Sequence, residues 1–135
     1  MKKILLVLIV IIISSCNQEN KLITNNRIGF YKLGELISKD FDEKVFEITL
    51  NDNNRIKSII VLSEDYKTKD GFGVGSELNT IEAFYKESIK QSLNISKGNI
   101  TIGSIGKSVN YNNIMFVDTN NDNLIDFVWI QTTGR

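Results

Sequence analysis

The amino-acid sequence predicts an α+β fold in which an antiparallel sheet is covered by one or two helices. Short runs rich in β-branched residues recur along the chain, with asparagine and glycine between them, and one segment has apolar residues at helical spacing. A chain of 135 residues has room for one compact domain. These observations favour a single sheet-based domain.

The first sixteen residues have the pattern of a secretory leader. Lys2 and Lys3 precede an unbroken apolar run over residues 4–13, and Ser14-Ser15-Cys16 closes the run with small residues. The run is much shorter than the roughly 20 residues that span a bilayer, which favours a cleaved signal peptide over a retained transmembrane helix. We therefore expect residues 1–15 to be removed, residues 16–26 to form a polar tether and residues 27–135 to form one globular α+β domain.

The tetrad Ile13-Ser14-Ser15-Cys16 resembles the lipobox of small bacterial lipoproteins. This resemblance implies that Cys16, the only cysteine, is acylated and becomes the first residue of the mature protein. Several acyl chains would anchor it firmly to a membrane. The expected location is the bacterial cell envelope. If the organism is Gram-negative, the outer membrane is expected, because the residue directly after the cysteine is Asn17 and not an aspartate.

The first half of the domain predicts short strands. Residues 27–33 indicate a strand that leads into a short helix around residues 35–38. Val45–Leu50 and Ile56–Leu62 are rich in β-branched residues and flank four residues, 51–54, whose side chains favour turns. We expect these two runs to form a β-hairpin.

The second half predicts the main helix and the remaining strands. Asn79 can cap the start of a helix, while the Glu82 side chain three residues later can accept from the Asn79 backbone N–H. Apolar residues then follow at helical spacing, at Ile81, Phe84, Tyr85, Ile89 and Leu93. This stripe is expected to face the sheet. The later segments 99–105, 107–111, 113–118 and 124–131 mostly indicate strands.

Composition excludes several classes of function. Basic and acidic residues are equal at 16 each, so the chain lacks the basic excess typical of a nucleic-acid-binding protein. Histidine is absent, which rules out imidazole-dependent triads and most zinc sites. The glycines at 71, 73 and 75 lack the spacing of a phosphate loop, and they are expected to serve a sharp turn.

The most informative polar segment is residues 118–127. Oxygen-bearing side chains occupy relative positions 1, 3, 5 and 9 of this segment, and the carbonyl of Leu124 stands at position 7. Oxygen ligands from alternate residues of a tight loop suit Ca²⁺. The segment resembles D-x-N-x-D-x-x-x-D calcium loops, which implies the ligand set Asp118, Asn120, Asp122, Leu124 and Asp126. Asn123 replaces the usual turn glycine, and Trp129 replaces the final Glu of an EF-hand. The alternative is a polar hairpin turn without metal.

Aromatic side chains offer a further candidate for ligand binding. Seven of them are available to stack on a ligand, at Tyr66, Phe72, Tyr85, Tyr111, Phe116, Phe127 and Trp129. Phe116, Phe127 and Trp129 alternate along strands, so they are expected in the core.

Together these features favour a membrane-anchored, non-catalytic envelope lipoprotein that binds an unidentified envelope protein or ligand and no nucleic acid. Two alternatives are a calcium-binding envelope module and a carboxylate-dependent envelope hydrolase, which needs no histidine. A concave pocket with two facing carboxylates would favour the hydrolase.

Overall fold

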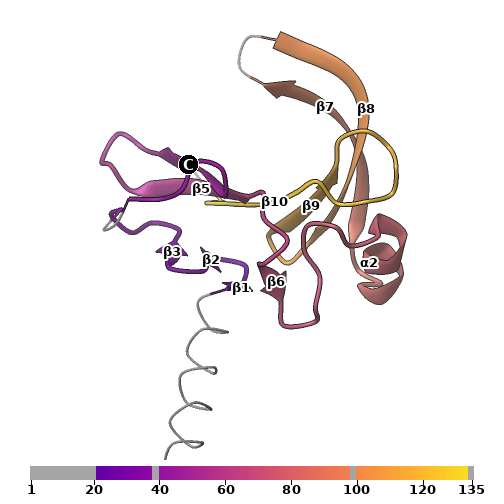
Figure 1. Cartoon of the computed structure of the whole chain (residues 1–135), viewed down its shortest axis with the longest axis horizontal. Helices are drawn as coiled ribbons and strands as arrows, with labels where there is room; N and C mark the ends of the chain where they lie inside the picture. The colour runs from indigo at the N-terminus through magenta and orange to yellow at the C-terminus, as the bar shows by residue number, and fades with distance from the viewer. Residues whose placement is uncertain (1–20, 38–39, 98–99, 134–135) are drawn as a thin grey trace, which may run out of the picture.

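The computed structural model describes residues 21–37, 40–97 and 100–133. Over these residues the chain forms ten strands in two sheets and a short helix (Figure 1). The fold is therefore mainly β, and the prediction of an α+β domain covered by one or two helices is wrong. The main reason is that the chain after residue 88 pairs as a long strand where helical spacing predicted a helix.

The larger sheet has six antiparallel strands in the order β4-β5-β10-β9-β8-β7. Its strands are β4 (Phe46–Leu50), β5 (Ile56–Val61), β7 (Ile89–Lys97), β8 (Ile100–Tyr111), β9 (Ile114–Asp118) and β10 (Phe127–Gln131). The predicted hairpin is confirmed as β4 and β5. Its turn is closed by the Asn51 side chain, whose Oδ1 accepts from the backbone N–H of Asn53 at 2.9 Å and of Arg55 at 3.1 Å.

The smaller sheet has four two-residue strands in the order β3-β2-β1-β6. They are β1 (Leu22–Ile23), β2 (Arg27–Ile28), β3 (Tyr31–Lys32) and β6 (Lys67–Thr68). Strand β1 pairs in parallel with β6, and Ile23 is buried. The folded structure therefore includes residues 22 and 23, which lie within the expected tether. The helix expected around residues 35–38 does not form at residues 35–37, where Leu36 bridges Arg55 instead, and its last residue lies outside the described residues.

The helix α2 (Leu78–Phe84) is shorter than the sequence predicted. Ile81 and Tyr85 are buried as expected, but the Phe84 and Ile89 side chains are 56% and 60% exposed, so the predicted buried stripe is wrong at both. Ile89 already belongs to β7, where it pairs with Asn110. Pairing with β8 overrides the local helical spacing.

The two sheets and α2 share one apolar core. It combines residues far apart in sequence, including Ile23, Ile28, Phe46, Ile81, Phe116 and Val128. Phe116 is fully buried as predicted, whereas Phe127 and Trp129 are only partly buried and lie outside this cluster. The core fixes the positions of the loops that carry the candidate sites.

Candidate functional site

The acidic segment forms the loop between β9 and β10. Asp118 ends β9 with its side chain buried, and its carboxylate accepts hydrogen bonds from the loop backbone. Oδ1 accepts from the N–H of Asn120 at 3.2 Å and of Asp122 at 3.3 Å, and Oδ2 accepts from the N–H of Asn123 at 2.8 Å. These bonds fold the loop tightly around the Asp118 carboxylate.

The loop brings three carboxylates together. Asp118, Asp122 and Asp126 each offer an oxygen, and these oxygens lie within 4.8 Å of one another. Two ligands at about 2.4 Å from one Ca²⁺ ion can be at most about 4.8 Å apart, so this spacing fits a single ion. Of the predicted ligand residues, the structure thus brings these three acids together.

Asn120 lies against the same carboxylates. With its amide nitrogen turned toward them, it donates to Asp118 Oδ1 at 3.0 Å and to Asp122 Oδ1 at 2.8 Å. Asp126 is held from the other side, because its Oδ2 accepts from the Thr119 N–H at 2.6 Å and from the Thr119 hydroxyl at 2.7 Å. Leu124 lies in the same loop, where its N–H donates to Asp122 Oδ1 at 2.9 Å.

Asn123 joins this loop to the helix. The Asn123 carbonyl accepts from the Leu78 N–H at 2.8 Å, and Oδ1 of its side chain accepts from the Asn79 N–H at 3.0 Å. Glu77, at the N-cap position of α2, makes no side-chain capping bond. The helix is therefore capped by a residue 44 positions away in sequence, in place of the predicted Asn79 and Glu82 pair.

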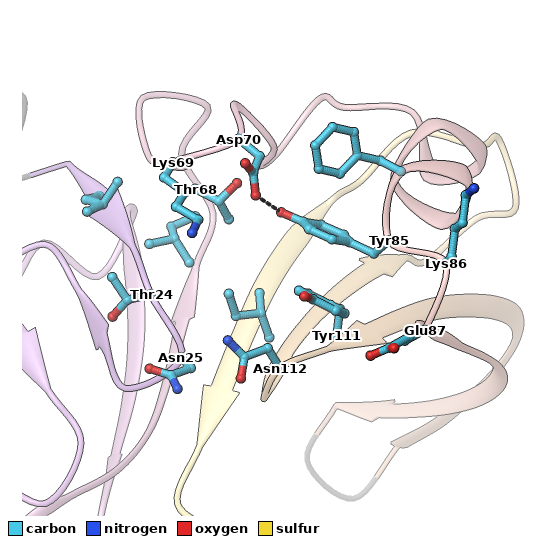
Figure 2. Close-up of a pocket in the computed structure, with 14 residues that line it drawn as sticks. Thr24, Asn25, Thr68, Lys69, Asp70, Tyr85, Lys86, Glu87, Tyr111 and Asn112 are labelled. Carbon is cyan, nitrogen blue, oxygen red and sulfur yellow. Dashed lines mark hydrogen bonds between the residues drawn. The ribbon is translucent and has the colours of Figure 1, made fainter.

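A second candidate site is a groove of about 720 Å³ between the smaller sheet and the α2–β8 region. Figure 2 shows Tyr85 and Tyr111 along one side, with Thr24 and Asn25 across from them. The two tyrosine rings are stacked, with centroids 4.0 Å apart and an angle of 10° between the ring planes. We call this the Tyr85–Tyr111 groove. Six of its lining residues are apolar or aromatic, namely Leu22, Ile23, Phe84, Tyr85, Tyr111 and Ile114.

The Tyr85 hydroxyl is fixed at one end of the groove. It donates to Asp70 Oδ2 at 2.6 Å, which Figure 2 draws as a dashed line. Burial, followed by this hydrogen bond to Asp70, raises the pKa of Tyr85 to about 12. The phenol is therefore protonated at neutral pH, and the ring presents an aromatic surface with a firmly held orientation.

Polar and charged groups surround the apolar strip. The groove is also lined by Thr24, Asn25, Thr68, Asn112, Lys69, Asp70, Lys86 and Glu87. The two lysines and two acids balance, so the lining as a whole carries no net charge. Asn113, in the β8–β9 turn, ties this turn to the β1–β2 turn and to the end of β10, because its Nδ2 donates to the Asn25 carbonyl at 2.8 Å and to the Gln131 carbonyl at 3.0 Å.

The sequence identifies Tyr85 and Tyr111 as residues that can stack on a ligand, but it does not place them in one groove. Their stacking depends on the end of α2 meeting the end of β8, which no local pattern reveals. Cys16, the predicted lipidation site, lies outside the described residues. Within the described part of the chain, no helix has the length and apolar character needed to cross a membrane.

Comparisons with protein-family models, with curated proteins and with solved structures found no match to this chain.

Proposed function

We propose that the protein is a lipid-anchored, non-catalytic lipoprotein of the bacterial cell envelope that binds its ligand in the Tyr85–Tyr111 groove. The leader and the position of Cys16 support the anchor. The observation that carries the binding role is a groove with a stacked aromatic pair on one side and amide and hydroxyl groups across from it. Ligand sites combine apolar walls with a few oriented polar groups in this way.

The anchor is tested by expressing the full chain in bacteria that are fed radiolabelled palmitate. We expect the protein to take up label and to fractionate with membranes, and Cys16→Ala to lose the label and enter the soluble fraction. Ser15→Ala is the matched control, because a small residue before the cysteine keeps the lipobox pattern. Membrane association and electrophoretic mobility that both stay unchanged in Cys16→Ala would show that the apolar run itself is the anchor.

A second candidate function, Ca²⁺ binding by residues 118–126, is favoured by the meeting of three carboxylates within 4.8 Å. We propose Asp118, Asn120, Asp122, Asp126 and the Leu124 carbonyl as its ligands, with the Asn120 amide rotating on binding so that its oxygen, in place of its nitrogen, faces the ion. Acids held this closely repel one another, so a cation that neutralises them should stabilise the folded state. The ion would then hold β9, β10 and the Asn123 cap of α2 in one arrangement.

The Ca²⁺ proposal is tested by thermal unfolding of the protein after chelation and after addition of millimolar Ca²⁺. At a hundred times the dissociation constant, we expect a stabilisation of about 2.7 kcal/mol, or roughly 10 °C. Asp122→Asn keeps an acceptor for the Leu124 N–H but should abolish the response. Asp52→Asn, in the exposed β4–β5 turn, should leave it intact. An unchanged melting temperature in the parent protein would rule out the site.

The hydrolase alternative has less support from the groove. Asp70 accepts a hydrogen bond from the Tyr85 hydroxyl, and Figure 2 places Glu87 in a separate part of the groove, away from Asp70. A carboxylate-dependent hydrolase such as a glycosidase needs two carboxyl groups that flank the bond to be cleaved. We therefore propose binding in preference to hydrolysis.

A further inference from the structure

We infer that the Tyr85–Tyr111 groove receives an acyl chain of a phospholipid from the membrane that holds the protein. This inference rests on the proposed lipid anchor and names the ligand class for the proposed groove.

The chemistry of the groove lining suits a hydrocarbon chain. Apolar side chains from β1, the end of α2 and the ends of β8 and β9 line one cavity. Two of them leave apolar surface open to solvent, since Leu22 is 36% exposed and Phe84 is 56% exposed. Phe84 contacts the rings of Phe72 and Tyr85 edge to face, which holds it beside the groove. A flexible hydrocarbon chain would cover these surfaces and remove them from water.

The expected anchor at Cys16 lies close to the groove along the chain. Leu22, Ile23, Thr24 and Asn25 line the groove and follow Cys16 by only a few residues. A fully extended chain from Cys16 to Leu22 spans at most about 22 Å. An acylated Cys16 would therefore keep β1, and the groove beside it, close to the bilayer surface. Tethering of this kind presents membrane lipids at a high effective concentration, which a soluble ligand lacks.

The groove also has polar groups beside its apolar strip. The side-chain amides of Asn25 and Asn112 offer hydrogen-bonding groups next to the apolar strip, as the ester and headgroup region of a lipid requires, whereas the Thr24 hydroxyl is already bonded to the Arg27 backbone. Lys69 and Lys86 are balanced by Asp70 and Glu87, so the lining gives no reason to favour one headgroup charge. The inference is accordingly confined to the acyl chain.

The test is photo-crosslinking with the full chain, purified from membranes and reconstituted into phosphatidylcholine vesicles. The vesicles contain a trace of phosphatidylcholine with a diazirine on its acyl chain. After flotation and illumination, mass spectrometry locates the crosslinked residues. We expect crosslinks at Leu22, Phe84, Tyr111 or Ile114, and none at Leu50, a 41% exposed apolar residue on β4 at the opposite edge of the larger sheet.

A variant pair sharpens the test. Phe84→Asp places a charge beside the groove and should lower crosslinking there by about tenfold, because it removes a large apolar contact. Leu50→Asp, the matched control, should leave it unchanged. If Phe84→Asp alters the circular dichroism spectrum, Phe84→Ser is used in its place with the same expected direction.

The outcomes separate the two proposals. Protein that floats with the vesicles but crosslinks equally at Leu50 and in the groove, or not in the groove at all, overturns the acyl-chain inference and leaves the anchor standing. Wild-type protein that does not float overturns the anchor and, with it, the inference built on it.

Discussion

Replacing Asn123 by alanine is expected to lower the free energy of unfolding by about 2 kcal/mol. Two effects contribute. The Asn123 side chain supplies the Oδ1 atom that accepts the Asn79 N–H at the start of α2, and losing such a cap costs about 1 kcal/mol. The Asn123 backbone also has φ of 70°, a left-handed conformation that asparagine tolerates better than alanine, which adds about 1 kcal/mol.

Two further variants separate these effects. Asn121 has a similar φ of 62° and is exposed, and its side chain makes no hydrogen bond within the described residues. Asn121→Ala should therefore show only the backbone cost of about 1 kcal/mol. Asn123→Gly tolerates the left-handed conformation and should show mainly the lost cap, again about 1 kcal/mol.

The assay is urea unfolding followed by the fluorescence of Trp129, the only tryptophan in the chain. With a slope of about 1.5 kcal/mol per molar urea, Asn123→Ala should lower the midpoint by about 1.3 M, and Asn121→Ala by about half as much. If Asn123→Ala were no more destabilising than Asn121→Ala, the loop side chain would not stabilise the helix, and the proposed link between the acidic loop and α2 would be refuted.

Two more predictions concern the core and the groove. Phe116→Ala should lower the free energy of unfolding by about 3 to 5 kcal/mol, measured with urea, because Phe116 is fully buried. Phe84→Ala should lower it much less, because Phe84 is 56% exposed. Equal losses in the two variants would contradict the assigned burial. The raised pKa of Tyr85 means that the unfolded state loses its phenolic proton first, so stability present below about pH 10 should fall as the pH rises to about 12. Tyr85→Phe should make this fall shallower, and the remainder should come from Tyr31 and Tyr66, whose pKa values are also raised, mainly by burial. A fall between about pH 10 and about pH 12 that is identical in the parent protein and in Tyr85→Phe would show that Tyr85 does not contribute.

Features set by local sequence were the ones that could be predicted. The hairpin of β4 and β5 depends on two β-branched runs and on the Asn51 side chain that closes their turn, all within one short segment. The same holds for the meeting of Asp118, Asp122 and Asp126, because a single tight loop carries all three. Whether that loop binds Ca²⁺ stays a prediction.

Features set by contacts between distant segments could not be predicted. Ile89 and Leu93 fit a helical stripe, but their backbones pair with Asn110 and Gly106 of β8, and this pairing decides their conformation. Strand β1 has only two residues, and its partner β6 lies more than forty positions further along the chain. The Tyr85–Tyr111 groove depends on both arrangements. The sequence pattern therefore predicted neither the residues that line the groove nor its closeness to the expected anchor.

The mass of the mature protein tests the lipid anchor most directly. Intact mass spectrometry of protein extracted from membranes, followed by analysis of its first peptide, reads both the cleavage site and the modification. The anchor proposal predicts a chain that begins at Cys16 and carries acyl chains on that residue. A chain that retains residues 1–15, or that bears an unmodified Cys16, would contradict it.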